Sequence, residues 1–316
     1  AVEMISYNSM EIAENTLFFC KGAHFKEQFL FDALKKGATA YVSEKKYDTD
    51  APCILVSDIR KSMYLSANFF YDNVWDKLNL VGITGTKGKS TTAYFIKYIE
   101  DEYLASIGKK KSAIVSSIDT YDGVINIESH LTTPEPFDLH KHFNNAVNSD
   151  IQHFTMEVSS QALKYGRTDG VTFTIGCYLN IGIDHISAIE HPDFEDYFQS
   201  KMKIFSQCQT AVINLDSDRS EDVVKASKNA PEVITFSTKD ENADVSEEMK
   251  PMQTSPEPLV SQTRPSHAKP VQHDTARVKA KKHVSKPKLE DADIKKKEKI
   301  DPKKLVVYSE IMKPKF

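Results

Sequence analysis

An apolar segment that leads straight into a glycine-rich loop restricts the folds open to this chain. Residues 80–92 read LVGITGTKGKSTT, and the stretch that follows, AYFIKYIEDEYL, repeats apolar side chains at helical spacing (Phe95, Ile96, Ile99 and Tyr103). A glycine-rich turn between a strand and a helix directs backbone N–H groups toward an anion. The segment therefore predicts a phosphate loop within an α/β fold.

The loop supplies the groups that a triphosphate needs. Gly85 and Gly88 permit a tight turn, Lys89 adds a cation, and Ser90 offers a hydroxyl ligand for Mg²⁺. The spacing departs from the common GxxxxGK[ST] pattern, because Ile83 stands where the first glycine would be. An accidental Gly/Lys turn is the alternative. The candidate nucleotide-binding residues are Gly85, Thr86, Lys87, Gly88, Lys89, Ser90 and Thr91.

Charge divides the 316 residues into two unlike parts. Residues 1–246 carry 24 Lys and Arg against 35 Asp and Glu, a net charge of −11, whereas residues 247–316 carry 17 against 10, a net charge of +7. The basic part has only Tyr308 and Phe316 as aromatic residues, so we predict a low-complexity, disordered tail there. The four cysteines form no CxxC pair and no apolar run reaches about 18 residues, which predicts a cytoplasmic protein without a membrane span.

The acidic part is predicted to form two α/β domains. Residues 1–73 contain the strands LFFCKG, ATAYVS and CILVS and two helices, 25–36 and 59–71. Residues 74–246 alternate the strands AIVSSI, HFTMEV, FTIGCYLN and TAVINLD with helices such as 137–147 and 194–205. Such alternation predicts a mostly parallel sheet with helices on both faces, and ligands at the carboxyl ends of its strands.

Three further candidates follow strands of this sheet. Glu157 ends an apolar strand and could ligate Mg²⁺, although a solvated acid is the alternative. In NIGIDH, residues 180–185, the polar residues are Asn180, Asp184 and His185, and the alternative is a helix capped by Asp184. Lys201 lies on a predicted helix, where most lysines are simply exposed.

The order of these motifs resembles the Mur ligase family. The matching runs are GTKGKST, HLTTPEP at 130–136, MEVSSQAL at 156–163, NIGIDH, and the helix that carries Lys201. The resemblance extends from about residue 5 to about residue 244 and is strongest to the members that add the third amino acid of peptidoglycan precursors. It implies a uridine-binding domain at 1–73 and a central ATP-binding domain at 74–246.

The resemblance also implies an activity. In this family ATP phosphorylates the carboxylate of a UDP-MurNAc-dipeptide, UDP-N-acetylmuramoyl-L-alanyl-D-glutamate, and a diamino acid, L-lysine or meso-diaminopimelate, displaces the phosphate. Lys89, Glu157, His185 and Lys201 match the catalytic positions, and Asn180 matches a nucleotide position. Ser90, Glu157, His185 and Lys201 match the Mg²⁺ site, with Lys201 converted by CO₂ to N6-carboxylysine. That conversion requires a neutral amine and so a lowered lysine pKa.

The substrate positions are implied in the same way. Thr132, Thr133, Ser159 and Arg167 match positions that bind the sugar nucleotide, and Arg167 suits an anionic oxygen. In residues 1–73, Ser9 and the loop Gly22-Ala23-His24 match the uridine site. The family usually has Asp-Ser-Arg where this chain has Asn8-Ser9-Met10.

Residues 247–316 show no sign of the third domain that binds the incoming amino acid in this family. A catalytically incomplete fragment or fusion product that binds nucleotide and UDP-sugar is therefore one alternative. A folylpolyglutamate synthase-like ligase is another, although TTPE and EVSS favour the peptidoglycan branch. The basic tail could attract nucleic acid, but it lacks interleaved aromatic residues, so we expect no nucleic-acid partner. We expect a monomer, as in relatives.

Overall fold

The computed structural model describes residues 1–22, 25–184, 187 and 190–246. The predictions for Ala23, His24, His185 and the tail at 247–316 lie outside these residues. Within the described part, no helix is long and apolar enough to cross a membrane.

The first described strands form a parallel sheet of four, in the order β1-β2-β3-β4. Successive residues of β2 alternate between its faces, so Phe18 packs under α1 and Phe19 packs under α2. Asp58 caps α2 by accepting a hydrogen bond from the Lys61 N–H. The elements are β1 (Met4–Ser6), β2 (Thr16–Phe19), α1 (Glu27–Lys35), β3 (Ala38–Ser43), β4 (Cys53–Leu55) and α2 (Ile59–Phe70).

A second sheet contains nine of the described strands, in the order β13-β12-β11-β10-β5-β9-β6-β7-β8. All neighbouring pairs are parallel except β6-β7 and β7-β8, so the predicted α/β class with a mostly parallel sheet is confirmed. The strands are β5 (Asn79–Thr84), β6 (Ala113–Val115), β7 (Asp119–Tyr121), β8 (Asn126–Glu128), β9 (His153–Glu157), β10 (Phe173–Tyr178), β11 (Cys208–Asn214), β12 (Glu232–Ser237) and β13 (Val245–Ser246).

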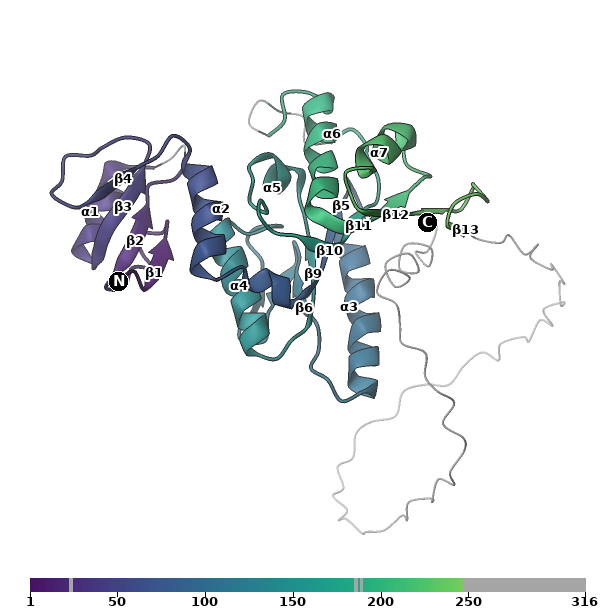
Figure 1. Ribbon diagram of the computed structural model, residues 1–316, viewed down its shortest axis with the longest axis horizontal. Helices are drawn as coiled ribbons and strands as arrows, with labels where there is room; N and C mark the ends of the chain where they lie inside the picture. Colours follow the sequence, from purple (N-terminus) through teal and green to yellow (C-terminus); the bar gives the residue numbers. More distant parts are fainter. Residues whose placement is uncertain (23–24, 185–186, 188–189, 247–316) are drawn as a thin grey trace, which may run out of the picture. The chain divides into compact units, whose positions relative to one another are not determined.

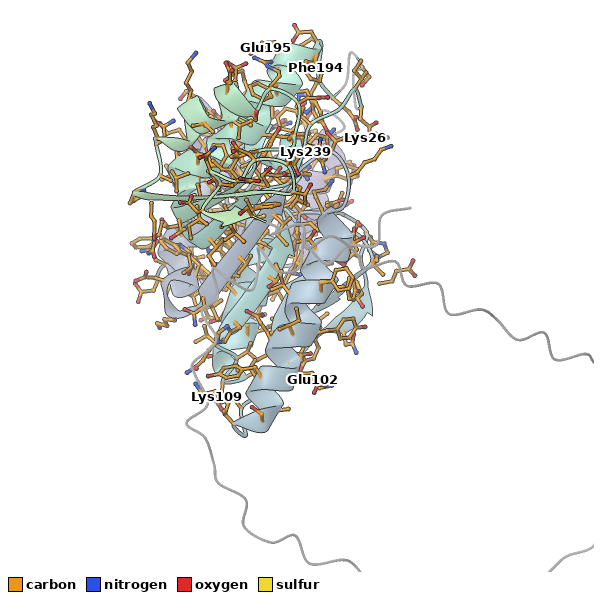
Figure 2. The ribbon with its side chains drawn as sticks, turned by 90° about the vertical axis from the view of Figure 1, so that its right-hand side faces the viewer. Lys26, Glu102, Lys109, Phe194, Glu195 and Lys239 are labelled. Carbon is orange, nitrogen blue, oxygen red and sulfur yellow. The ribbon has the colours of Figure 1, made fainter. Side chains whose placement is uncertain are left out.

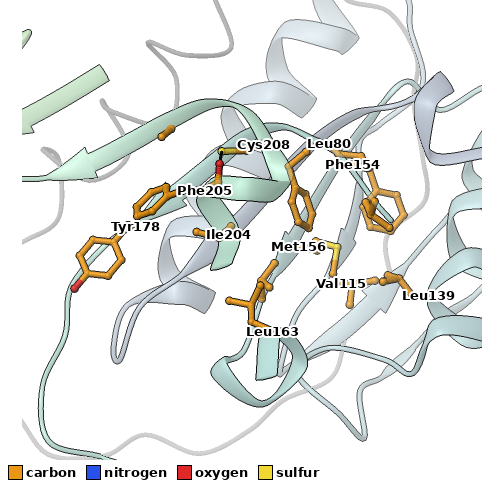
Figure 3. Packing of buried hydrophobic residues seen from close by; sticks show 14 of the residues in the cluster. Leu80, Val115, Leu139, Phe154, Met156, Leu163, Tyr178, Ile204, Phe205 and Cys208 are labelled. Carbon is orange, nitrogen blue, oxygen red and sulfur yellow. Dashed lines mark hydrogen bonds between the residues drawn. The ribbon is translucent and has the colours of Figure 1, made fainter. Parts of the chain in front are cut away.

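Helices cover both faces of this sheet, as predicted (Figure 1). Val81 and Ile83 of β5 face α3, whereas Leu80 faces the opposite core, which Figure 3 shows together with Met156 and Leu163. The remaining elements are η1 (Val74–Lys77), α3 (Lys89–Ser106), α4 (Pro136–Asn148), α5 (Ser160–Lys164), α6 (Phe194–Met202), η2 (Lys203–Gln207) and α7 (Ser220–Ser227).

Some boundaries differ from the sequence prediction. The strand expected at AIVSSI ends at Val115, because the Ser116 hydroxyl accepts hydrogen bonds from the N–H groups of Ile118 and Asp119, at 3.0 Å each, and turns the chain. The helix expected at 194–205 ends at Met202 and continues as a 3₁₀ turn. The sequence reading did not identify β7, β8, α5 or α7.

The strand order decides where the site forms. Strands β10, β5, β9 and β6 are neighbours in the sheet, and Ile83 of β5 pairs with Glu157 of β9. Because these strands are parallel, the segments that follow them emerge at one edge. Helix α3 leads away from that edge, with Glu102 near its far end (Figure 2).

Candidate nucleotide and ligand site

The phosphate loop joins β5 to α3, as the sequence predicted. Gly88 precedes α3 with φ of 85°, in the left-handed region that favours glycine. Gly85 lies against the segment that follows β10, where an added Cβ would come within 3.0 Å of the Leu179 Cβ. The loop N–H groups therefore lie at the N-terminus of α3, the positive end of an 18-residue helix, and this arrangement suits a phosphate.

Asn180, in the segment that follows the neighbouring strand β10, holds the loop. Its Oδ1 accepts hydrogen bonds from the N–H groups of Thr86 (3.1 Å) and Lys87 (3.0 Å), and its Nδ2 donates to the Lys87 carbonyl at 3.0 Å. Thr86 is fixed from its other side, because its hydroxyl lies 3.0 Å from the Tyr197 hydroxyl and accepts from the Gly182 N–H at 3.0 Å. These contacts fix the shape of the loop from two sides.

Two lysines meet beneath this loop. Lys89 and Lys201 both donate to the Gly85 carbonyl, at 3.1 and 2.9 Å. Lys201 is 1% exposed, and its Nζ lies 4.6 Å from the centre of the Tyr197 ring. Burial, together with the charge of Lys89, lowers the pKa of Lys201 well below its ordinary value. The alternative of a surface lysine is therefore wrong.

Glu157 is also buried, at 1% exposed, so the solvated-acid alternative is wrong as well. Its Oε1 accepts from the Ser117 N–H at 2.8 Å and the Ser117 hydroxyl at 3.1 Å, and the Ser117 and Ser90 hydroxyls lie 3.0 Å apart. No group of three or more His, Cys, Asp or Glu side chains gathers in the described residues. The carboxylate and two hydroxyls nevertheless form an oxygen donor set, which fits Mg²⁺.

The residues predicted to bind the sugar nucleotide line one cavity of about 180 Å³ beside this loop. The Thr133 hydroxyl donates to the Glu157 carbonyl and accepts from the Ser159 N–H, both at 3.0 Å, and Arg167 donates to the Thr133 carbonyl at 3.1 Å. The predicted residues on the cavity wall are Lys89, Thr132, Thr133, Ser159, Arg167 and Lys201.

An ion-pair chain connects Arg167 to the first sheet. Glu135 accepts from Arg167 at 3.0 Å and from Lys21, which follows β2, at 2.7 Å. Lys21 also lines a second cavity, of about 370 Å³, that contains the predicted residues Ser9 and Gly22. Asn8, which stands where the family usually has Asp, also lines this cavity. Its side-chain oxygen accepts a hydrogen bond from the Met10 N–H at 3.1 Å and so shapes the turn between these two residues.

Comparison with known proteins gives the same assignment as these motifs. Residues 83–268 match the family model described as the Mur ligase middle domain. The chain is 45% identical over 216 residues to the UDP-N-acetylmuramoyl-L-alanyl-D-glutamate–L-lysine ligase of Streptococcus pneumoniae strain R6, covering 68% of this chain and 44% of that protein. The ligase of the same name from Enterococcus faecalis is 46% identical, covering 69% of this chain and 42% of that protein. The chain belongs to the Mur ligase family. It spans less than half the length of these two relatives.

Solved structures support the Mur ligase fold. A structure of UDP-N-acetylmuramoyl-L-alanyl-D-glutamate–2,6-diaminopimelate ligase superposes with a TM-score of 0.62 at 23% identity, covering 77% of this chain and 50% of that one. MurF from Acinetobacter baumannii gives a TM-score of 0.55 at 18% identity, covering 78% of this chain and 49% of that one. At these identities the likeness concerns the fold.

Other sequence predictions for this Mur ligase chain have mixed outcomes. Lys87 and Thr91 are exposed, in the loop and in the first turn of α3. The alternative that Asp184 caps a helix concerns residues 185 and 186, which lie outside the described residues; the next described helix, α6, begins at Phe194 and is capped by Asp193. His185 lies outside the described residues.

Sequence reasoning missed Ser117, Lys21 and Tyr197. Ser117 and Lys21 follow strands of parallel sheets, so the rule that ligands gather at strand carboxyl ends could have found them. Tyr197 lies within a helix, where no local pattern distinguishes it from a core residue.

Proposed function

We propose that this chain carries the ATP and UDP-sugar sites of a ligase that joins UDP-N-acetylmuramoyl-L-alanyl-D-glutamate to a diamino acid. One observation carries the proposal: the two lysines under the phosphate loop and the residues that match sugar-nucleotide positions line the same cavity. A carboxylate held there by Arg167 would lie beside the loop that holds a triphosphate. Gathering these two anions is the main requirement of acyl phosphate formation.

The chain's own side chains would perform most of this work. The N–H groups of residues 85–90 would bind the β and γ phosphates of ATP, and Lys89 would compensate their charge. Thr132, Thr133, Ser159 and Arg167 would hold the dipeptide end of the substrate. The carboxylate oxygen then attacks the γ phosphorus, ADP leaves, and the amine of the diamino acid displaces phosphate from the acyl phosphate.

Mg²⁺ would be held by Ser90, Glu157 and, as the family resemblance implies, His185, and when bound it neutralises phosphate charge. Lys201 would complete this site as N6-carboxylysine. Its buried position supports this role, because a lowered pKa favours the neutral amine that adds CO₂. The donor set around Glu157 suits the ion, since hydroxyl and carboxylate oxygens are hard ligands.

Residues 1–73 would form the uridine domain and residues 74–246 the ATP-binding domain. The cavity lined by Ser9 and Gly22 would receive the uridine end, and Lys21 would link it through Glu135 to Arg167. Lys21 is suited to the diphosphate between the two ends, because a cation there balances phosphate charge.

The relatives at 44–46% identity bear the name of L-lysine ligases, which favours L-lysine over meso-diaminopimelate as the second substrate and the peptidoglycan branch over a folylpolyglutamate synthase-like activity. A chain that binds both ligands without turnover is the second candidate; the region compared covers 44% of the pneumococcal relative. The two candidates share the binding of ATP and of the UDP-sugar and differ in the release of products.

Calorimetric titration tests the binding sites. We expect the chain to bind a non-hydrolysable ATP analogue with Mg²⁺, and to bind UDP-MurNAc-dipeptide separately. Lys89→Ala should weaken analogue binding by about 10- to 100-fold, the equivalent of one or two charged hydrogen bonds. Lys87→Ala removes an exposed charge from the same loop and should have a smaller effect. Failure to bind either ligand would contradict the proposal.

Product release separates the two candidates. ADP that forms only with UDP-MurNAc-dipeptide present, followed by a lysine-containing product on addition of L-lysine, supports the ligase. Binding of both ligands without ADP supports the second candidate.

A further inference from the structure

A hydrogen-bonded chain of three side chains ends on the wall of the 180 Å³ cavity. The Ser160 hydroxyl, on that wall, lies 2.9 Å from His191 Nε2, and His191 Nδ1 lies 2.6 Å from Asp196 Oδ2. A hydroxyl, an imidazole and a carboxylate in this order form the arrangement that moves protons in many hydrolases. None of the three has a role in the function proposed above.

Two helices hold these three side chains in place. Ser160 begins α5, directly after the capping residue Ser159, and Asp196 lies in the first turn of α6. His191 is 0% exposed, and its ring meets the Tyr197 ring edge-on at 5.1 Å. Lys164 of α5 donates to Asp196 Oδ2 at 2.7 Å and to the Glu190 carbonyl at 3.0 Å. Among the residues that the structure describes, the charged and titratable groups around the imidazole are thus Asp196, Lys164, Tyr197 and its chain neighbour Glu190.

The surroundings fix the direction of each hydrogen bond. The hydrogen bonds from Lys164 and His191 keep the pKa of Asp196 below its ordinary value, so this carboxylate is ionised and only accepts. In the neutral form of the imidazole, His191 Nδ1 therefore carries the hydrogen and Nε2 presents a lone pair to the Ser160 hydroxyl. Ser160 donates to Nε2, which leaves its oxygen lone pairs for a ligand in the cavity. Ser160 is thus an acceptor on a wall whose other members include the cations Lys89, Arg167 and Lys201.

We propose that Ser160, His191 and Asp196 form a relay that takes the proton from the ammonium group of the incoming amine. This inference rests on the proposed ligase function. Ser160 accepts a hydrogen bond from the ammonium group and passes a proton to His191 Nε2, and Asp196 stabilises the imidazolium. Ser160 is the catalytic residue, while His191 and Asp196 act through it.

The proton balance of ligation requires such an acceptor. An acyl phosphate and an ammonium ion give an amide, hydrogen phosphate and one free proton. The amine nitrogen forms the C–N bond, the bond between the acyl carbon and the bridging oxygen breaks, and the phosphate leaves with that electron pair. Of the two protons that the nitrogen loses, one departs with the phosphate and the other enters the relay. Asp196 and Lys164, with side chains 33% and 23% exposed, connect the relay to solvent.

Two small amines of different basicity test the relay in the full chain. Methylamine is protonated at pH 7 and must lose a proton before it attacks, whereas hydroxylamine is already neutral. Each replaces the diamino acid in a reaction with ATP and UDP-MurNAc-dipeptide, and mass spectrometry quantifies the methylamide or the hydroxamate while ADP release is recorded. The variants are His191→Gln and Asp196→Asn. Glu195→Gln is the matched control, since Glu195 lies on the same helix and pairs with Arg219 instead.

We expect both relay variants to lose about 100-fold in methylamide formation, within the usual range for general base catalysis. Hydroxamate formation and the ADP released in the first turnover should stay near those of the unaltered chain. In Glu195→Gln all three quantities should be unchanged. Equal losses with both amines, or a loss of the first-turnover ADP, would show that the trio only supports the cavity wall and would overturn the relay. If the unaltered chain releases no ADP, the proposed ligase function fails and the relay with it.

Discussion

Replacing Lys201 by methionine tests the burial of a charged side chain beneath the phosphate loop. Lys201 is 1% exposed, and its amine donates to the Gly85 carbonyl at 2.9 Å. Methionine is unbranched and flexible enough to occupy similar space. The substitution therefore removes the titrating group and leaves most of the packing.

The magnitude follows from proton linkage. A lysine in the unfolded chain titrates near about 10.4, and burial and the Lys89 charge place the folded-state pKa of Lys201 well below that. Between these two pKa values the unfolded chain holds a proton that the folded chain has released. The free energy of unfolding therefore rises with pH, by up to about 1.4 kcal/mol per pH unit. Over two pH units this contribution reaches at most about 3 kcal/mol, and Lys201→Met lacks it.

Urea unfolding measures this contribution. Trp75 is the one tryptophan of the chain, packs against the core of the nine-stranded sheet, and reports unfolding by its fluorescence. We expect the stability of the unaltered chain to increase from pH 7 to pH 9 relative to Lys201→Met, with coincident far-UV circular dichroism curves as the check on two-state behaviour. The buffers must be free of CO₂, because a carbamate would replace the titrating amine.

If the free energy of unfolding changed with pH in the same way in the unaltered chain and in Lys201→Met, this reasoning would be refuted. Such a result would mean that the Lys201 amine has the same pKa in the folded and unfolded chains and so reaches water. Lys89→Met is the matched control. Lys89 is only half-buried and burial lowers its pKa as well, so the slope should change in the same direction by a smaller amount.

One substitution in the loop, one in the segment that holds the loop and one near the first sheet extend these tests. Asn180→Ala removes three side-chain hydrogen bonds to Thr86 and Lys87, and at about 1 kcal/mol each calorimetry should show about 100-fold weaker binding of the ATP analogue. Unchanged affinity would mean that the loop keeps its shape without the amide. Gly85→Ala places a Cβ 3.0 Å from a neighbouring side chain and should lower the free energy of unfolding by about 1–3 kcal/mol. Gly182→Ala, whose added Cβ would lie 4.0 Å from its nearest neighbour, should hardly change the unfolding midpoint. Equal shifts of the midpoint in the two variants would contradict the packing argument. Lys21→Ala should weaken binding of UDP-MurNAc-dipeptide and spare that of the ATP analogue, and equal losses of both would count against its assignment to the sugar nucleotide.

Much of the fold was predictable because it depends on local periodicity. Alternating apolar segments and helical repeats predicted the parallel sheet, its covering helices and the phosphate loop. The short antiparallel strands β7 and β8 escaped prediction, since neither DTY nor NIE is an apolar run and β8 is exposed along its whole length.

The site was predicted less completely. The loop residues, Asn180 and Lys201 lie together, and the sugar-nucleotide candidates line one cavity beside them, while the roles assigned to all of them remain predictions. Ser117, Lys21 and Tyr197 were missed, because each acquires its partners from a different element. A sequence motif shows which residues are neighbours along the chain and not which are neighbours across a sheet.

The sequence by itself determined the glycine turn, the helix that follows it and the alternation of strands and helices, because these features depend on backbone freedom and on periods of two and 3.6 residues. Only the tertiary structure decided that Lys201 is buried under the Gly85 carbonyl, 116 positions away in the sequence, and that Ser160 contacts His191, 31 positions away. Both contacts follow from which strands and helices became neighbours. That order is set by packing of the whole core, and the same packing removes water from the lysine and lowers its pKa.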